Sequence, residues 1–448
     1  MTSTISVKEK VAYGLGDTAS NFIFQTVMLF LTYYYTDIVG LNPATVGSMF
    51  LLVRLIDAVT DPLMGSLADR TRTRWGSYRP YLLWMAVPFA VISVLAFTTP
   101  DTDYQGKLTY AVTSYIALML MYTAINIPYS ALGGVITADP NERVAVQSYR
   151  FIFAMIGGLF VTSFTLPLVS KFGGGDDAKG YQLTMLLMGV LGMFLFLLCF
   201  AGTKERLKPE KPLLMPLKEQ LKAVWRNDQC RILCLVSVVL LTGILLRNSL
   251  AIYYVKYVLN RPDDVTLFVT TGMVGGLIGC AFAHPLAKRF GKIKLYVGLQ
   301  LGAALACMVN YFIPVNMWLM ALLVHFVWGF LLQMTSPLLW AKMADVTDYG
   351  EAQSGVRLTG VTFSTIVFFI KFGVALGSAL SGWLLAVYGY QAGQVTEQVN
   401  DGIAFSFCIL PAIMSVLVVI IMRWYTLDAK QLEATQQQIQ AARLSATH

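Results

Sequence analysis

The feature that most constrains this chain is a series of apolar segments, each near the ~20 residues that cross the hydrocarbon core of a bilayer. Twelve such segments account for most of the 448 residues. In lipid, a helix satisfies its own backbone hydrogen bonds. The pattern therefore predicts an all-α, polytopic membrane protein. We expect its twelve transmembrane helices at 12–39, 44–67, 81–99, 108–132, 150–170, 181–201, 232–258, 264–287, 294–313, 317–340, 359–388 and 404–424.

Composition excludes the main alternatives. Apolar residues make up 56% of the chain and charged residues 13%, against about 45–50% and about 25% in soluble domains. A soluble enzyme or a disordered chain would carry far more charge. The net charge of +8 comes from short loops and not from one basic face, so no nucleic-acid partner is expected. We expect the six scattered cysteines to be small apolar residues, with no disulfide framework and no zinc site.

Lysine and arginine are shared unequally between the two sides of the predicted bundle. Twenty-five lie on the side that holds both termini, five on the other side and three inside the segments. Loops rich in Lys and Arg stay in the cytoplasm. We therefore predict cytoplasmic termini in the inner membrane of a bacterium. The N-terminus has no signal-peptide pattern, so the first spanning helix would direct insertion.

A charged stretch at 203–230 divides the chain near its midpoint. We interpret it as a cytoplasmic linker between an N-terminal six-helix bundle at 1–202 and a C-terminal six-helix bundle at 231–425. A polar cytoplasmic tail follows at 426–448. Each half has a short basic loop after its second segment, which is a weak sign of internal repetition. Two six-helix halves around a midplane site are typical of secondary transporters.

The second segment carries ionisable residues, which are costly inside a membrane and indicate function there. Asp57 and Asp61 are four residues apart and share a helix face with Arg54. Together with Thr60, the carboxylates offer oxygen ligands for a small cation such as sodium, or they could share one proton. A structural Arg–Asp pair is the alternative. We favour cation binding, because one arginine cannot neutralise two carboxylates.

Polar stripes at helical spacing occur in two further segments. Tyr122, Asn126 and Ser130 recur every four residues in the fourth segment. Substrate contact and helix–helix hydrogen bonding explain this stripe equally well. In the first segment, Asp17 and Asn21 share a face. Asp17 lies near the cytoplasmic end, where a hydrated structural role is open to it, and Asn21 lies deeper and is the better substrate candidate.

Basic and histidine residues of the segments have different interpretations. Arg150 begins the fifth segment, where a cytoplasmic anchor is the simpler role. Lys371 has no acid within a turn, so we expect it to face a cavity or to pair across helices. Arg247 could extend its head group toward the surface. His284 and His325 are more typical of hydrogen-bonded polar residues than of metal ligands.

The tenth segment ends in a cluster of acids that includes Asp345 and Asp348. We interpret this cluster as an inner gate or a salt-bridge network with cytoplasmic arginines. Arg143 and Arg357 are the candidates, and Arg54 is a further coupling candidate. The chain shows no Walker motif, metal-ligand cluster or catalytic triad pattern, so neither an ATP-driven pump nor an enzyme is supported.

Motifs from the first segment to the eleventh resemble those of the glycoside–pentoside–hexuronide:cation symporters. They are Tyr13-Gly-Leu-Gly16, Tyr34-Tyr-Thr-Asp37, Arg54-Leu-Ile-Asp57-Ala-Val-Thr-Asp61-Pro62, Thr73-Arg-Trp-Gly76, Asn126-Ile-Pro128, Ala344-Asp345-Val-Thr-Asp348-Tyr-Gly-Glu351 and Lys371-Phe-Gly373. The resemblance implies the major facilitator fold with alternating access. It implies a cation site at Asp57, Thr60, Asp61 and Thr123. It also implies that Arg150 and Lys371 belong to the sugar site and its coupling network.

Departures from the family's melibiose permease concern the sugar site. Two acids, a lysine and two tryptophans of that permease are replaced here by Asn21, Asn126, Ser20, Ser130 and Ser336. We therefore do not expect melibiose to be the substrate. Without the two acids the pocket would be more positive, which suits a hexuronide, yet the chain looks closer to members for pentosides and xylose-containing oligosaccharides. Thr60 replaces an asparagine, which bears on the choice among sodium, lithium and proton.

These features predict a secondary transporter that imports a sugar or glycoside by symport with sodium or a proton. We expect the cation to bind first, the sugar second, and the halves to rock only when both are bound. The alternatives are a lipid or lysolipid translocase, a non-transporting sensor and an exporter of the same sugars. No cofactor is expected beyond the coupling ion. The expected partners are a small sugar and the lipid bilayer, and the expected functional unit is a monomer.

Overall fold

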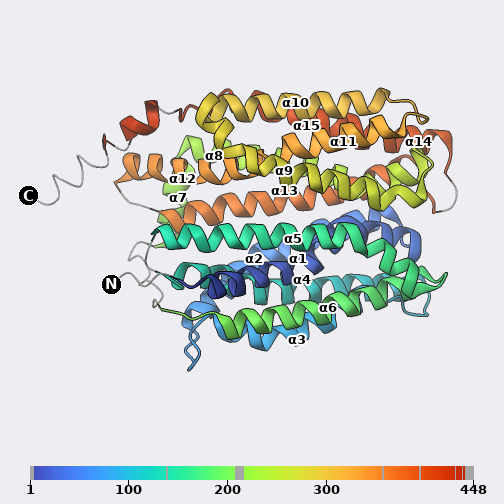
Figure 1. The fold of residues 1–448 in the computed structure, drawn as a ribbon, viewed down its shortest axis with the longest axis horizontal. Helices are drawn as coiled ribbons and strands as arrows, with labels where there is room; N and C mark the ends of the chain where they lie inside the picture. Colours follow the sequence, from blue (N-terminus) through green and yellow to red (C-terminus); the bar gives the residue numbers. More distant parts are fainter. Residues whose placement is uncertain are drawn as a thin grey trace, which may run out of the picture. The chain divides into compact units, whose positions relative to one another are not determined.

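The computed structural model describes residues 5–137, 140–206, 216–355, 358–392, 395–428, 430–435 and 437–438. Within these ranges the chain forms helices and connecting turns and no β-strand, so the predicted all-α fold is confirmed (Figure 1). Among the described residues, ten helices are long and apolar enough to cross a membrane. The helix at the first predicted segment is not among them, and at the second segment the described residues contribute a shorter apolar helix, Pro43–Arg54.

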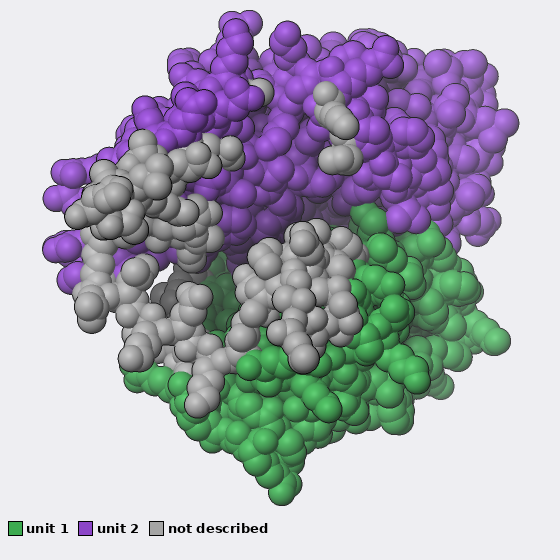
Figure 2. Space-filling view, turned by 60° about the vertical axis from the view of Figure 1, so that its left-hand side comes forward, with its two compact units in different colours: residues 1–211, 385–395 green, residues 212–384, 396–448 purple. Residues whose placement is uncertain are grey.

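The chain divides into two compact units (Figure 2). Unit 1 consists of Met1–Lys211 and Leu385–Val395. In this unit α1 packs against α5 and α6, α3 packs against α4 and α6, and α2 packs against α4. The helices of unit 1 are α1 (Val7–Tyr33), η1 (Tyr34–Ile38), α2 (Pro43–Arg70), α3 (Arg79–Ala96), α4 (Tyr104–Val135), α5 (Pro140–Gly173) and α6 (Asp177–Gly202).

Unit 2 consists of Pro212–Leu384 and Thr396–His448, and it includes the second half of the predicted linker as the helix α7. Here α9 packs against α11, and α15 packs against α8 and α10. The helices of unit 2 are α7 (Leu217–Arg226), α8 (Asp228–Tyr253), η2 (Tyr254–Val258), η3 (Pro262–Asp264), α9 (Val265–Phe290), α10 (Lys292–Phe312), α11 (Trp318–Gln333), α12 (Thr335–Ser354), α13 (Thr359–Val387), α14 (Glu397–Ala404), η4 (Phe405–Ile409) and α15 (Leu410–Met422).

The helices α1 and α8 end in the same way, which reveals a repeat that the sequence barely shows. Each continues into a π-helical turn, η1 after α1 and η2 after α8. Six residues after the first residue of that turn, Gly40 and Asn260 have positive φ angles of 81° and 52°. Glycine has no Cβ, and asparagine tolerates this region better than most residues. Both helices therefore end in the same backbone conformation, a π-helical turn followed by a residue with a positive φ angle.

The predicted segment at 317–340 is divided in the structure. α11 ends at Gln333, Met334 separates the two helices, and α12 begins at Thr335. Pro337 explains the break, because its ring has no N–H and clashes with the carbonyl four residues earlier, that of Gln333. The freed carbonyl accepts a hydrogen bond from Cys280 Sγ on α9 at 3.4 Å.

Glycines bring α9 and α11 into backbone contact. A Cβ atom on Gly275 or Gly279 would overlap a backbone carbonyl of α11, and one on Gly329 would overlap the carbonyl of Gly272. Small residues let membrane helices approach closely, where van der Waals contact and weak hydrogen bonds hold them together. The contact therefore depends on the absence of side chains at these positions.

Two glutamates of unit 1, Glu9 and Glu205, form hydrogen bonds with residues that are distant in the sequence. The carboxylate of Glu205 accepts three backbone N–H bonds of 2.8 Å from residues 77–79 and so caps the N-terminus of α3. Glu9 at the start of α1 accepts two hydrogen bonds of 2.8 Å from the guanidinium of Arg206. The hydrogen bonds to Glu9 raise the pKa of Arg206, so the guanidinium stays charged at every physiological pH.

Candidate functional site

Arg54 and Asp57 form a buried ion pair within α2. Arg54 Nη1 donates to Asp57 Oδ2 at 2.9 Å, and the two side chains are only 6% and 5% exposed. Three buried atoms beside this bond lack a hydrogen-bond partner in the described part of the chain: Arg54 Nη2, Asp57 Oδ1 and Thr60 Oγ1. A buried polar atom without a partner costs about 1–3 kcal/mol. The two oxygens are suited to a bound cation, which would satisfy both.

Asp61 faces α4, where Thr123 Oγ1 donates to its Oδ1 at 2.9 Å. This bond joins residues 62 positions apart and brings together two of the four positions that the family resemblance assigns to one cation site. No group of three or more His, Cys, Asp or Glu side chains gathers among the described residues. The side chains on this face of α2 offer carboxylate and hydroxyl oxygens, which suit hard cations.

Arg150 of α5 reaches α1 and α4. Its Nε donates to Asp17 Oδ2 at 3.2 Å and its Nη2 donates to Ser130 Oγ at 3.3 Å. Asp17, for which a hydrated structural role was open, pairs with Arg150, and its side chain is only 12% exposed. Arg150, with 20% of its side chain exposed, is likewise more than a surface anchor.

An aromatic pair supports Arg150. Its guanidinium lies 5.1 Å from the ring centre of Tyr129, which stacks on Tyr13 at 4.8 Å. Tyr129 also donates to the backbone carbonyl of Tyr13 at 2.7 Å. A Cβ atom on Gly16 would overlap the Tyr129 ring, which explains this glycine of the first motif. Tyr129 is not among the site residues predicted from the sequence, although it directly follows Pro128 of a matched motif.

The remaining unit 1 candidates differ in how much hydrogen-bonding capacity they keep. Asn21 Nδ2 donates to the carbonyl of Asp17 within α1 at 2.9 Å. Tyr122 packs between Phe24 and Phe89, with ring centres 5.4 and 6.2 Å away. The buried Oδ1 of Asn126 has no hydrogen-bond partner among the described residues. Of these three candidates, Asn126 therefore has the clearest unused polar atom.

In unit 2, Lys371 and Ser336 lie on α13 and α12. Gly373 packs against the backbone of α8 at Val238. Lys371 precedes it by two residues, which is about 200° around an α-helix, so Lys371 lies on the face away from α8. Ser336 is half-buried in the first turn of α12. Their roles in sugar binding stay predictions.

The acids predicted to form an inner gate lie near the end of α12. Asp345 accepts hydrogen bonds of 2.8 and 3.0 Å from Lys292 Nζ on α10, a partner within its own unit. Asp348 lies one turn further along and is half-buried. Arg357 and the side chain of Arg143 lie outside the described residues, so the gate stays a prediction.

Arg247 is fully buried, which corrects the alternative that it extends to the surface. Its guanidinium lies between Phe407 and Trp328, 4.0 and 4.6 Å from the ring centres, and donates to the Phe407 carbonyl at 2.9 Å. Phe407 is in the π-helical turn η4. His325 stacks on Phe268 at 4.0 Å and lies 3.4 Å from Arg247 Nη2. The side chain of His284 lies outside the described residues.

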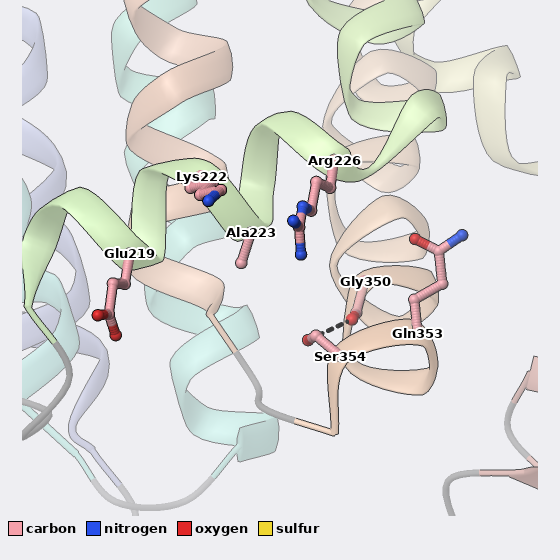
Figure 3. A pocket seen from close by; sticks show the side chains of 7 residues that line it. All are labelled: Glu219, Lys222, Ala223, Arg226, Gly350, Gln353 and Ser354. Atoms are coloured by element: carbon pink, nitrogen blue, oxygen red, sulfur yellow. Dashed lines mark hydrogen bonds between the residues drawn. The ribbon is translucent and has the colours of Figure 1, made fainter.

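A surface pocket of about 670 Å³ separates α7 from the end of α12. Figure 3 shows Arg226 extending from α7 toward Gly350 and Ser354 of α12. The pocket lining carries Lys222 and Arg226 as well as Glu219, and it includes none of the residues predicted for cation or sugar binding.

Comparison with known proteins yields relatives along nearly the whole chain. The family described as "MFS/sugar transport protein" matches residues 12–429. The inner membrane symporter YicJ of Escherichia coli (strain K12) is 40% identical over 98% of this chain and 96% of its own length. The putative glycoside/cation symporter YagG of the same organism is 39% identical, covering 97% and 95%.

A more distant relative and a solved structure complete the comparison. The isoprimeverose transporter of Lactiplantibacillus pentosus is 33% identical and covers 94% of this chain and 88% of its own length. The crystal structure of a D-xylose–proton symporter superposes with a TM-score of 0.69 at 16% identity, covering 95% of this chain and 98% of that chain. At that identity the superposition shows the fold alone.

Proposed function

Because the chain belongs to the family of MFS/sugar transport proteins, we propose that it imports a glycoside, with pentosides as the first candidates, by symport with a monovalent cation. Family membership makes it a multi-pass membrane transporter of the major facilitator fold. The names of its relatives, a glycoside/cation symporter and an isoprimeverose transporter, support a glycoside as the cargo. The Lys and Arg asymmetry supports an inner-membrane orientation with cytoplasmic termini.

The observation that carries this proposal is the pair of unsatisfied buried oxygens on α2. Asp57 Oδ1 and Thr60 Oγ1 are one helical turn apart on the face that also presents Asp61. A cation bound there supplies positive charge to the carboxylates and a partner to the hydroxyl. Burying the site without it leaves charge and hydrogen-bonding capacity uncompensated. The cation thus has a higher affinity for the closed state than for the open one, which is the differential affinity that coupling requires.

The hydroxyl of Thr60 favours sodium over a proton as the coupling ion. Two carboxylates suffice to share a proton. A metal cation needs more oxygen ligands than two carboxylate oxygens supply, and Thr60 Oγ1 is a suitable additional ligand. We therefore assign Thr60 to sodium selectivity, with the sugar bound by Asn126, Ser130, Arg150 and Lys371.

Sodium-dependent stabilisation of the purified protein tests the proposal. Sodium chloride is compared with choline chloride at constant ionic strength, and bound sodium raises the unfolding temperature by mass action. Thr60→Val keeps the shape of the side chain and removes the hydroxyl, so we expect its half-maximal sodium concentration to rise at least ~10-fold. A xyloside should stabilise the wild type more when sodium is present.

The matched control is Thr165→Val on α5, a buried threonine whose hydroxyl donates to the Val161 carbonyl of its own helix. Its sodium response should equal that of the wild type. Equal responses of Thr60→Val and Thr165→Val would refute the assignment of Thr60. The absence of any sodium or sugar effect on the wild type would refute cation-coupled glycoside transport itself.

A further inference from the structure

Arg150 keeps part of its hydrogen-bonding capacity for a ligand. Asp17 and Ser130 take Nε and Nη2, and the Tyr129 ring lies against the guanidinium. In the described part of the chain no residue accepts a hydrogen bond from Nη1. A guanidinium nitrogen of this kind is a donor only, so Nη1 is suited to a hydroxyl or carboxylate oxygen.

Asp17 already compensates the positive charge of Arg150, whereas the Nη1 donor is still available to a ligand. The membrane-embedded part of unit 1 presents two arginines in its described residues, and each contacts one aspartate, Arg54 with Asp57 and Arg150 with Asp17. Separating one partner from a buried ion pair is strongly unfavourable, because it leaves an isolated charge. Counting only the loss of acids at Asn21 and Asn126 therefore overstates the positive character of the site.

The Asp17–Arg150 pair is held in place by the packing of α1 on α5. Thr18 Oγ1 donates to the Phe153 carbonyl at 2.7 Å, and a Cβ atom on Gly157 would press against the backbone of Thr18. One turn before Asp17, Gly14 packs on the Phe153 ring in the same manner. Asp17 thus lies between two close contacts of α1 with α5, which hold its backbone beside Arg150.

We propose that Asp17 is a specificity-determining residue: it neutralises Arg150 and so restricts transport to neutral glycosides and excludes uronides. This inference rests on the proposed function. A neutral sugar hydroxyl accepts from Nη1 and leaves the Asp17–Arg150 pair intact. A uronide carboxylate competes with Asp17 for the same guanidinium, and one of the two carboxylates is then buried without compensation.

Competition for uptake tests the role of Asp17. Wild type and Asp17→Asn are reconstituted in liposomes, and uptake of a labelled xyloside is challenged with three unlabelled p-nitrophenyl glycosides. The xyloside is the neutral reference, the glucoside controls for size, and the glucuronide differs from the glucoside by a carboxylate. In the wild type the glucuronide should compete at least ~100-fold more weakly than the xyloside.

Asp17→Asn is nearly isosteric and removes the charge, so the glucuronide should gain at least ~10-fold relative to the xyloside, while the glucoside does not. Asp17→Glu should keep the wild-type order. Asp17→Ser serves as a second charge-removing variant if Asp17→Asn does not fold. A purely structural role would lower uptake of all three sugars in parallel and leave their ratios unchanged.

The outcomes separate this inference from the proposed function. A wild type that accumulates no labelled glycoside refutes the proposed function. A wild type that transports the xyloside and accepts the glucuronide equally well refutes only the role of Asp17. The same holds if the charge-removing variants keep the wild-type ratio of glucuronide to xyloside.

Discussion

Asp57 and Asp61 lie four residues apart on α2, yet the structure gives them different partners. Asp57 pairs with Arg54 within the helix, and Asp61 accepts from Thr123 of α4. The sequence predicts that Arg54, Asp57 and Asp61 share a face of α2, because this follows from helical spacing alone. It does not predict the Asp17–Arg150 contact, whose members are 133 positions apart, since only the packing of α1 on α5 brings them together.

A double-mutant cycle tests the Arg54–Asp57 pair. Asp57→Asn leaves the buried Arg54 without its counter-charge and should lower the free energy of unfolding by about 3–5 kcal/mol. The double variant Arg54→Gln/Asp57→Asn removes both charges and should recover a large part of this loss. Chemical denaturation in detergent measures each variant. Additive effects would contradict a direct interaction between the two residues.

At the scale of helices, the sequence predicts the centres of the long segments better than their ends. The segment at 317–340 is predominantly apolar along its length, so its hydropathy predicts one continuous helix. Pro337 is the residue in it that indicates the break between α11 and α12. The π-helical turns that end α1 and α8 have no compositional signal, because backbone geometry defines them. Segment 385–395 clusters with unit 1, which no pattern of hydropathy indicates.

The glycine contact between α9 and α11 gives a prediction at the same scale. Gly329→Ala places a methyl group against the Gly272 carbonyl and should destabilise unit 2 by about 1–3 kcal/mol, as overpacking does. Gly298→Ala on α10 is the matched control, because nothing lies within 4 Å of its added Cβ. Thermal unfolding of both variants measures the difference. Equal unfolding temperatures would show that the two helices separate without cost.

For the whole molecule, the all-α fold follows from the apolar segments, because a chain in lipid has few ways to satisfy its backbone. The family follows from motifs spread along the chain, and the matched relatives confirm it. The net charge of the sugar site, in contrast, does not follow from the sequence. Counting substituted acids predicts a positive site, whereas the Asp17–Arg150 pair shows that one positive charge is already compensated.

The central claim is that cation and glycoside are carried together, and reciprocal flux in proteoliposomes tests it most directly. Labelled sodium and labelled xyloside are followed in the same vesicles. The account predicts that an inward sodium gradient drives accumulation of the xyloside above its external concentration, and that external xyloside accelerates sodium entry. Coupling must be reciprocal, because each ligand changes the affinity for the other by the same factor. Xyloside uptake that only equilibrates, with sodium entry unchanged by the sugar, would contradict the account.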